Sequence, residues 1–381
     1  MFKPFRKNDP ALNLLNKVMV DLPSPSSISL WWNLGSLLGL CLAIQIASGI
    51  FLSFHYCVSV DQSFDSVVHI VQEAMWGWTL RALHVNGGTC FFVCLYIHMG
   101  RGLYYGNYAN FHTWASGVVL FILTMATAFL GYILPWGQMS FWGATVITSL
   151  FSAVPYIGSE LVEWLWGGFS VGGPTLVRFY SLHFIVPFII AGLTMIHLLY
   201  LHQGGSKNPL GLSSDVDKIP FHPYYSVKDI LGFVFVLFFL IYLSFFYPYM
   251  LCEADNFLDA NPLVTPTHIQ PEWYFLFVYA ILRAVPNKLG GVVALVSSLL
   301  IFFLVPYLHL GKFQGMSLYP LSQLLFWSFV GNFFLLTWIG ARPVEDPYIF
   351  LGQVFSLYYF MFFFLNPIFQ KVSDLTYQKS V

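Results

Sequence analysis

Four histidines form two pairs with the same spacing. His84 and His98 lie fourteen positions apart in one apolar stretch, and His183 and His197 lie fourteen positions apart in another. In an α-helix, fourteen steps correspond to about 3.9 turns and a rise of about 21 Å. Both imidazoles of a pair therefore point toward nearly the same helix face, at two depths of a hydrocarbon layer roughly 30 Å thick.

One histidine in an apolar helix is as readily a hydrogen-bonded contact between helices as a metal ligand. A spacing shared by two helices favours ligation, because two facing histidines can hold one iron from both axial sides. Such an iron has no open position for oxygen or substrate, so it can only pass electrons. The pattern predicts two bis-histidine haems, one held by His84 and His183 and the other by His98 and His197.

Glycines in the neighbouring apolar stretches repeat the interval. Gly35 is fourteen positions from Gly49, and Gly117 is fourteen positions from Gly131. A glycine lets a flat macrocycle press on the helix backbone, although small residues also serve ordinary helix packing. The period shared with the histidines favours haem binding.

Two arginines flank the first histidine pair. Arg81 and Arg101 each lie three residues outside their histidine, toward the aqueous side. A guanidinium there can pair with a haem propionate through two hydrogen bonds. It can equally extend to the membrane surface without a ligand, and the spacing leaves both interpretations open.

The composition is that of a membrane protein. Hydrophobic residues make up 57% of the 381 positions, charged residues only 9%, and the mean hydropathy is +0.70; a soluble domain carries about a quarter charged residues. The five cysteines form no CxxC pair and no CxxCH motif, so we expect non-covalent haem. The net charge of −1 gives no indication of nucleic-acid binding. No cleavable leader is expected, because the first long apolar run begins near Trp31.

Apolar runs of membrane-spanning length predict an all-α membrane protein with eight transmembrane helices, the first four forming a bundle around the two haems. The region at about 139–170 is broken by proline, glycine and acids, so we expect it to lie at the membrane interface. The predicted spans are 31–54, 77–103, 113–134, 176–201, 230–248, 290–310, 321–339 and 349–369.

The charges follow this topology. An even number of crossings places both termini on one side, which then holds 11 of the 16 Lys and Arg residues, while 11 of the 17 acids fall on the other side. By the positive-inside rule, the termini face the negative compartment.

Several local motifs, together with the twin H-x13-H pairs, resemble the mitochondrial cytochrome b family, the dihaem subunit of ubiquinol:cytochrome c reductase (respiratory complex III). The resemblance covers nearly the whole chain in order. The motifs are "WWNLGSLLGL", "GRGLYYG", "LPWGQMSFWGATV", "PFHPYYSVKD" and "PEWYFLFVYAILRAVPNKLGG".

The resemblance implies a Q cycle coupled to proton translocation. Quinol is oxidised on the positive side, and one electron passes to a Rieske iron–sulfur protein. The other electron crosses two haem b groups, the low-potential one at His84 and His183 and the high-potential one at His98 and His197, and reduces quinone on the negative side. It also implies ubiquinone as substrate, cytochrome c1 and other complex III subunits as partners, a homodimeric complex in membrane lipid, and the mitochondrial inner membrane with both termini in the matrix. A bacterial homologue is the alternative.

The family division would give an interfacial segment at 1–30, a four-helix dihaem domain at 31–210 and a four-span C-terminal domain at 211–381. Within the last, "PEWY" marks the quinol oxidation site. A carboxylate in an apolar pocket can accept a proton near neutral pH, but proline followed by an acid is also ordinary helix-start chemistry. The resemblance favours the pocket, with these residues as its members: Glu272, Tyr279, Tyr132, Gly143 and Phe129.

For the quinone reduction site, the resemblance points to a histidine at the end of the fourth span and an aspartate at the start of the fifth, which could deliver protons to the two carbonyls. Capping or interfacial solvation is the alternative for each residue. The set is His202, Asp229, Lys228, Ser206, Asn33 and Ser36. The remaining histidines that we considered, at positions 69, 112, 222, 268 and 309, have no expected catalytic role.

Two other classes also use membrane helices of this kind. A dihaem anchor of a membrane dehydrogenase or hydrogenase would have histidine pairs, but it would lack "PEWY" and the four additional spans. A secondary transporter would have discontinuous helices at midplane ion sites and inverted repeats, which this sequence does not suggest.

Overall fold

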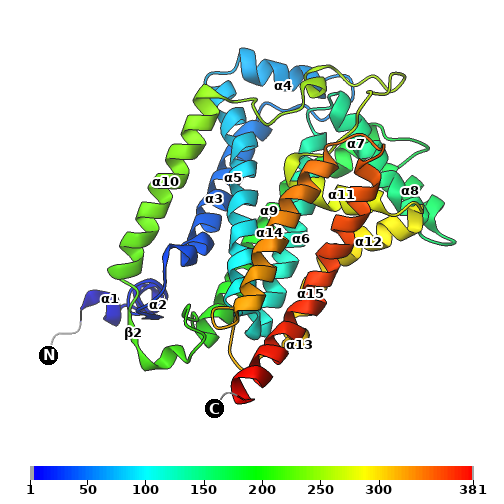
Figure 1. Cartoon of the computed structure of the whole chain (residues 1–381). Coiled ribbons are helices and arrows are strands. Elements are labelled where there is room, and N and C mark those ends of the chain that lie inside the picture. Colours follow the sequence, from blue (N-terminus) through cyan, green and yellow to red (C-terminus); the bar gives the residue numbers. More distant parts are fainter. Residues whose placement is uncertain (1–3, 380–381) are drawn as a thin grey trace.

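The computed structural model describes residues 4–379, so residues 1–3 and 380–381 of the two predicted terminal segments lie outside the described part. Within it, seven helices are long and apolar enough to cross a membrane. They run side by side in Figure 1. They are α3 (Leu34–Ser53), α5 (Gly77–Tyr104), α6 (Phe111–Ile133), α9 (Gly173–Gly204), α10 (Tyr224–Phe246), α14 (Pro320–Gly340) and α15 (Tyr348–Lys379).

These helices confirm the predicted all-α membrane class. Their outer faces carry many exposed large apolar residues, such as Phe235 and Leu199, which a lipid environment accommodates without cost. Helix α10 begins at Tyr224, earlier than the predicted span, so Asp229 lies in its second turn and does not open the helix.

The remaining predicted span, 290–310, is not one continuous helix. It consists of α12 (Lys288–Leu300), the 3₁₀-helix η7 (Ile301–Phe303) and α13 (Val305–Leu308) in succession. Pro306 explains the break, since proline has no N–H to donate to the carbonyl of Phe302. The indole of Trp114 on α6 donates to that carbonyl instead, over 2.7 Å.

Short elements cover the two ends of the bundle. The end that carries both termini holds α1 and α2, and the opposite end holds α4, α7 and α8 (Figure 1). The predicted interfacial region at 139–170 forms α7, η3 and α8, none of which is long enough to span. The shorter elements are α1 (Phe5–Asn8), α2 (Pro10–Met19), η1 (Leu30–Trp32), α4 (Ser63–Gln72), η2 (Asn107–Ala109), α7 (Gln138–Ser149), η3 (Leu150–Ala153), α8 (Gly158–Trp166), η4 (Ser214–Val216), η5 (Ala254–Phe257), η6 (Trp273–Phe275) and α11 (Leu276–Ala284).

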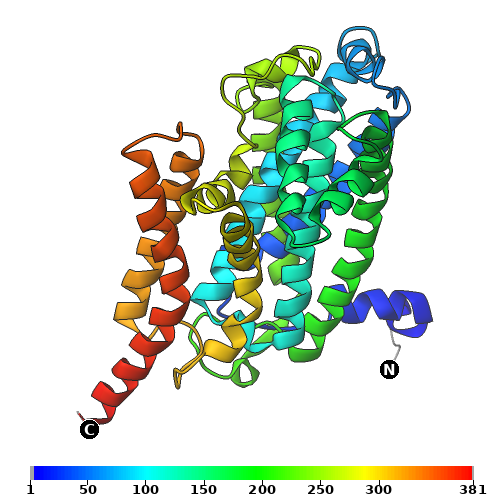
Figure 2. The ribbon, with the colours of Figure 1, turned by 90° about the vertical axis from the view of Figure 1, so that its right-hand side faces the viewer.

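Two packed helix pairs form the N-terminal bundle. Helix α5 packs against α3, and α9 packs against α6, while α10 lies against α5. In the C-terminal part, α11, α14 and α15 pack on one another, and Figure 2 shows α14 and α15 at one flank of the molecule. A buried aromatic cluster joins the two parts, because Phe92 of α5 stacks on Tyr274 with ring centroids 4.1 Å apart.

A two-stranded antiparallel pairing closes the end near the N-terminus. Strand β1 (Pro23–Pro25) pairs with β2 (Lys218–Pro220), so that Ser24 lies opposite Ile219. Nearby, the Tyr225 hydroxyl donates to the carbonyl of Pro25. These contacts attach the segment before α3 to the start of α10 and set the two helices beside each other.

Candidate functional sites

Two of the four paired histidines face each other between α5 and α9. The ring centroids of His84 and His183 are 6.2 Å apart, and the rings are inclined by 85°. Two imidazoles on opposite sides of one metal ion, each with a metal–nitrogen distance of about 2 Å, hold their ring centroids roughly 6 Å apart. The separation therefore fits one iron between the two rings.

The outer nitrogen of each ring already has a hydrogen-bond partner. Nδ1 of His84 lies 2.9 Å from the hydroxyl of Ser48, and Nδ1 of His183 lies 2.8 Å from the carbonyl of Thr127. The carbonyl fixes the proton of His183 on Nδ1 and leaves Nε2 free to ligate. Such contacts orient metal-bound histidines in proteins.

A cavity of about 240 Å³ adjoins this pair. Its walls come from α3, α5, α6 and α9, and they are mostly apolar. Five predicted site residues line it: Gly49, Arg81, His84, Gly131 and His183.

The second pair, His98 on α5 and His197 on α9, lies closer to the end of the bundle that carries the termini. The hydroxyl of Ser116 is 3.0 Å from Nδ1 of His197, which repeats the arrangement of His84. His98 differs, because its Nδ1 lies 3.2 Å from a guanidinium nitrogen of Arg101.

Arg101 is the notable cation of this level. Its Nε is buried and has no hydrogen-bond partner among residues 4–379, and its guanidinium lies 5.3 Å from the ring centroid of Trp32. A buried cation without a carboxylate is costly, so the position fits an anionic group of a ligand. A haem propionate has that chemistry.

The four predicted glycines each lie against a paired histidine. A Cβ atom at Gly131 would be 2.4 Å from Cε1 of His183, and one at Gly49 would be 3.1 Å from Cε1 of His84. At the other level, a Cβ at Gly117 would be 3.2 Å from Cε1 of His197. The fourth contact, from Gly35 to Cε1 of His98, would be 3.7 Å. The glycines thus make room for the imidazoles themselves.

At the end of the bundle opposite the termini, Glu272 lies half-buried directly before η6. Burial raises the pKa of Glu272 to about 7, and the nearby Glu253 adds to the shift. Tyr132 of α6 lies close enough to interact electrostatically with Glu272, and its buried hydroxyl has no hydrogen-bond partner among the described residues. Burial is the main cause that raises the pKa of the Cys252 thiol to about 11, and the charge of Glu272 adds to this shift.

Contacts to α5 fix the segment that follows Glu272. The indole of Trp273 donates to the Thr89 hydroxyl over 3.2 Å, and the Tyr96 hydroxyl donates to the carbonyl of Tyr274 over 2.5 Å. The "PEWY" segment is therefore anchored to the helix that also carries His84 and His98.

The other predicted members of this pocket occupy three elements. Tyr279 lies on α11, where its hydroxyl donates to the carbonyl of Ile269 over 3.2 Å and the Arg283 guanidinium lies 4.6 Å from its ring centroid. Phe129 lies on α6, one turn before Tyr132. Gly143 on α7 has open space beside it, since a Cβ there would meet nothing within 4 Å.

Four of the six predicted quinone-reduction residues meet where α3 approaches α10. The Ser36 hydroxyl donates to the Asp229 carboxylate over 2.7 Å, and the Asn33 amide donates to the carbonyl of Lys228 over 2.6 Å. Lys228 in turn donates to the carbonyl of Ile28 over 3.1 Å. The Asp229 carboxylate and the Lys228 ammonium group are thus neighbours in the sequence, but each is bonded to a different partner.

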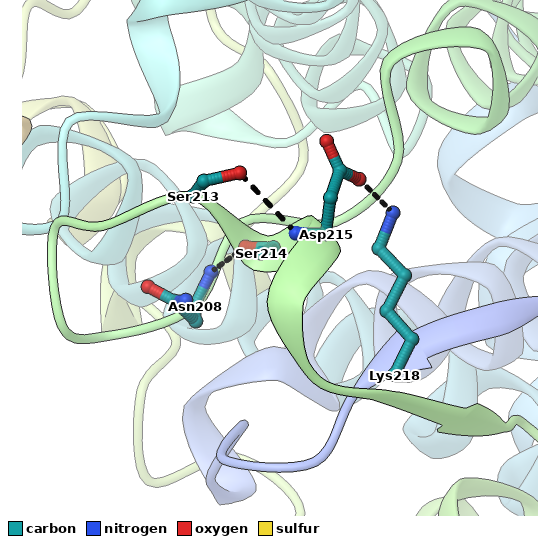
Figure 3. A network of polar contacts seen from close by, with 5 residues as sticks. All are labelled: Asn208, Ser213, Ser214, Asp215 and Lys218. Atoms are coloured by element: carbon teal, nitrogen blue, oxygen red, sulfur yellow. Dashed lines mark hydrogen bonds and ion pairs between the residues drawn. The ribbon is translucent and has the colours of Figure 1, made fainter.

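The other two, His202 and Ser206, lie at the end of α9 and in the loop after it. No hydrogen bond of the described residues joins either of them to Asp229. Figure 3 shows the polar contacts that fold this loop: the Ser214 hydroxyl accepts from the N–H of Asn208, and Lys218 contacts Asp215 at 2.5 Å. These contacts hold residues 208–218 in one conformation.

The residues that form hydrogen bonds to the paired histidines were not predicted from the sequence. Ser48, Ser116 and Thr127 contact the paired histidines from α3 and α6, and Gln45 donates to the carbonyl of His84 over 2.9 Å. The fourteen-residue interval of the histidines and glycines did not by itself indicate that these residues would contact the imidazoles. Ser48 and Ser116 do, however, each precede one of the spaced glycines in the sequence. Glu253 was likewise missed, because it is distant in sequence from Glu272.

Comparison with known proteins gives one consistent result. A family model described as Cytochrome b/b6/petB matches residues 19–205, and one described as Cytochrome b(C-terminal)/b6/petD matches residues 259–360. A chain in a solved structure titled "Hyperthermophilic respiratory Complex III" is 31% identical, with a TM-score of 0.90 over 96% of this chain and 98% of that one. The chain therefore belongs to the cytochrome b family, whose members are haem-binding electron-transfer proteins of membranes.

Proposed function

We propose that this protein is the dihaem subunit of a quinol:cytochrome c reductase and that it carries electrons across the membrane in a Q cycle. The similarity to a chain of a respiratory complex III over nearly the full length supports this proposal. The separation of the His84 and His183 rings is the observation that carries it, and the contact of Ser116 with His197 repeats the contact of Ser48 with His84.

Each level would bind one non-covalent haem b through a histidine from α5 and one from α9. When bound, the haems supply one-electron redox centres at two membrane depths. His84 and His183 would hold the low-potential group, and His98 and His197 the high-potential group. The glycines keep the imidazoles in position, and Arg81 and Arg101 would neutralise the propionates.

Quinol oxidation would occur near Glu272. A carboxyl group with a pKa of about 7 is partly ionised at neutral pH, so Glu272 can accept a proton from a quinol hydroxyl. Tyr132, Tyr279, Phe129 and Gly143 would form walls of this pocket. Tyr132 interacts electrostatically with Glu272 and directly follows Gly131, whose backbone lies against His183, which supports a pocket beside the His84 and His183 pair.

Quinone reduction would occur at the other end, near the junction of α3 and α10. Asp229, held by Ser36, and His202 would each provide a proton to one quinone carbonyl. Asn33, Lys228 and Ser206 would complete the polar wall. Binding of quinone would have to bring His202 and Asp229 to the same molecule.

The wider assignments follow from the same proposal. The chain would divide into an interfacial segment at 1–30, a dihaem domain at 31–210 and a C-terminal domain at 211–381. It would function as a homodimeric complex with a Rieske iron–sulfur protein, cytochrome c1 and other subunits. The mitochondrial inner membrane with both termini in the matrix is the proposed location, and ubiquinol is the proposed substrate.

Haem stoichiometry in the purified assembly tests the proposal that the chain binds two haem b groups. We expect two haem b groups per chain in a pyridine haemochrome assay, and His98→Ala should abolish the spectrum of one group and leave the other. His112→Ala is the matched control, since His112 is exposed and its ring contacts Phe111 and Tyr200 but none of the four paired histidines. Equal loss of both spectra in the His98 variant would overturn the pairing, and a haem-free chain would support a transporter.

Quinol-dependent cytochrome c reduction tests the second part. The purified assembly should catalyse it, and Glu272→Gln should lower the rate at least several-fold while both haem spectra are retained. A dihaem anchor of a dehydrogenase would keep the haems but show no such activity. Unchanged activity of the Glu272 variant would refute the proposed proton acceptor without affecting the haem assignment.

A further inference from the structure

One of the spaced glycines follows a serine that contacts the same histidine. A Cβ atom at Gly49 would lie 3.1 Å from Cε1 of His84, so the glycine lets this ring approach α3 closely. Ser48, the residue before it, is buried, and its hydroxyl oxygen lies 2.9 Å from Nδ1 of His84. Glycine and serine thus contact one imidazole from adjacent positions.

The same dipeptide occurs on α6, beside the other histidine pair. A Cβ atom at Gly117 would lie 3.2 Å from Cε1 of His197. The hydroxyl oxygen of Ser116, the residue before it, lies 3.0 Å from Nδ1 of that ring. A serine followed by a glycine therefore serves one histidine of each pair.

The hydroxyl hydrogens of both serines have acceptors on their own helices. Ser48 donates to the carbonyl of Ile44 over 2.7 Å, and Ser116 donates to the carbonyl of His112 over 2.8 Å. Such bonds to the carbonyl four residues earlier are common for serine in helices. The serine oxygen then accepts from the imidazole, so the proton of each ring lies on Nδ1 and Nε2 is left for a metal.

The remaining two paired histidines have other partners. Nδ1 of His183 lies 2.8 Å from the carbonyl of Thr127, and Nδ1 of His98 lies 3.2 Å from a guanidinium nitrogen of Arg101. Leucine, not serine, precedes each of the two glycines that lie against these rings. Each pair therefore contains one ring that is bonded to a serine and one that is not.

We propose that Ser48 and Ser116 are positioning residues that set the orientation and donor strength of His84 and His197, and through them the redox potential of one haem each. The inference rests on the proposed electron-transfer function. A hydrogen bond from Nδ1–H to an acceptor makes an imidazole a stronger donor to a metal at Nε2. A stronger donor stabilises the oxidised iron, and hydrogen bonding around the ligands is one of the means by which proteins set such potentials.

The orientation of the rings depends on the same contacts. The rings of His84 and His183 are inclined by 85°. An imidazole bound through Nε2 is free to turn about that bond unless its outer nitrogen is held. Ser48 holds one ring from α3, and the carbonyl of Thr127 holds the other from α6. Loss of the Ser48 hydroxyl would leave only one of the two rings fixed.

The two serines differ in how much of the contact they supply. Ser48 is the hydrogen-bond partner that the His84 ring has among residues 4–379. The His197 ring also contacts the carbonyl of Thr113, which would still accept from it without Ser116. We therefore expect a larger effect from the loss of Ser48.

Redox titration of the haem spectra in the purified assembly tests the proposal. Ser48→Ala should raise the midpoint potential of the haem at its own histidine pair and leave the other unchanged. Ser116→Ala should raise the potential of the other haem, by a smaller amount. His98→Ala, which removes one haem, shows which component belongs to which pair.

Electron paramagnetic resonance reports on the position of the rings. In an oxidised haem with two axial imidazoles, the largest g value falls as the ring planes turn from perpendicular toward parallel, so Ser48→Ala should lower it. Ser48→Thr keeps a hydroxyl and should restore both the g value and the potential. Thr194→Ala is the control and should change neither, because the Thr194 hydroxyl donates to the carbonyl of Ile190 over 2.8 Å on α9.

The outcomes separate this inference from the proposed function. Unchanged potentials in both alanine variants of an assembly with two haems, or an equal shift of both haems in either variant, would overturn the inference alone. Loss of haem confined to the pair of the substituted serine, and reversed by threonine, would support it. An unaltered assembly without two haems would refute the proposed function and this inference with it.

Discussion

At the scale of the residue, the glycines beside the histidines differ in how tightly they fit. A Cβ at position 131 would lie 2.4 Å from Cε1 of His183, closer than real Cβ contacts allow, whereas one at position 35 would lie 3.7 Å from Cε1 of His98, an ordinary contact. Both glycines therefore lie against an imidazole, but only position 35 has room for the methyl group of alanine.

We predict that Gly131→Ala displaces the His183 ring and abolishes haem binding at that level, while Gly35→Ala keeps both haems. Redox difference spectra of membranes, with haem quantified per chain, measure the outcome. Equal haem content in the two variants would contradict the idea that the glycines make room for the imidazoles.

Glu272 gives a second prediction at this scale. Its pKa is raised from its usual value of 4.5 to about 7 by burial and by Glu253, so the folded state binds the proton more tightly than the unfolded state. Between pH 4.5 and 7 the folded protein holds more protons, and stability therefore falls as the pH rises through this window. The destabilisation is fully present above pH 7, at most on the order of 3 kcal/mol.

Glu272→Gln should therefore raise the thermal stability of the assembly at pH 8 and change it little at pH 4.5. Thermal inactivation of the haem spectrum at the two pH values measures the difference. Glu160→Gln, on the exposed surface of α8, is the control. A Glu272 variant that is stabilised equally at both pH values would argue against the raised pKa.

At the scale of the element, Pro306 and Trp114 act together. Pro306 removes a backbone donor from the α12–α13 segment, and the Trp114 indole supplies a replacement to the carbonyl of Phe302. A buried carbonyl that loses its donor costs about 1–3 kcal/mol. The break in this segment is thus stabilised by a side chain of another helix.

We predict that Trp114→Phe lowers the thermal stability of the assembly, and that the loss is smaller in a Pro306→Ala background, where the backbone can donate to Phe302. A double-mutant cycle of inactivation temperatures measures the coupling. Additive effects of the two changes would show that the indole does not compensate for the proline.

At the scale of the whole molecule, both termini lie at the same end of the bundle (Figure 1). The loop between α8 and α9, which contains the open position Gly168, lies near the other end. This arrangement fits the even number of crossings expected from the sequence, provided that α12, η7 and α13 together count as one crossing.

Epitope tags should test this topology. Tags placed at the N-terminus and at the C-terminus should be accessible from one side of sealed vesicles, and a tag inserted at Gly168 should be accessible only from the other. Solubilised vesicles, in which all three tags react, are the control. Termini that label from opposite sides would mean that the α12–α13 segment does not cross the membrane.

Much of this protein can be predicted from features that repeat along one helix. His84 and His98 are fourteen residues apart, as are Gly117 and Gly131. In an α-helix this interval places both residues of each pair on nearly the same face. Apolar runs of sufficient length and the distribution of charge likewise indicate the crossings and their orientation. Such signals are local, so no knowledge of packing is needed to find them.

Contacts between helices could not be predicted in this way. The partners of the histidine rings, such as Ser48 and Thr127, and the approach of Glu253 to Glu272 depend on which helix faces which. A periodic sequence specifies the face that each helix presents, but the depth and rotation at which two faces meet are set by packing of the complete chain.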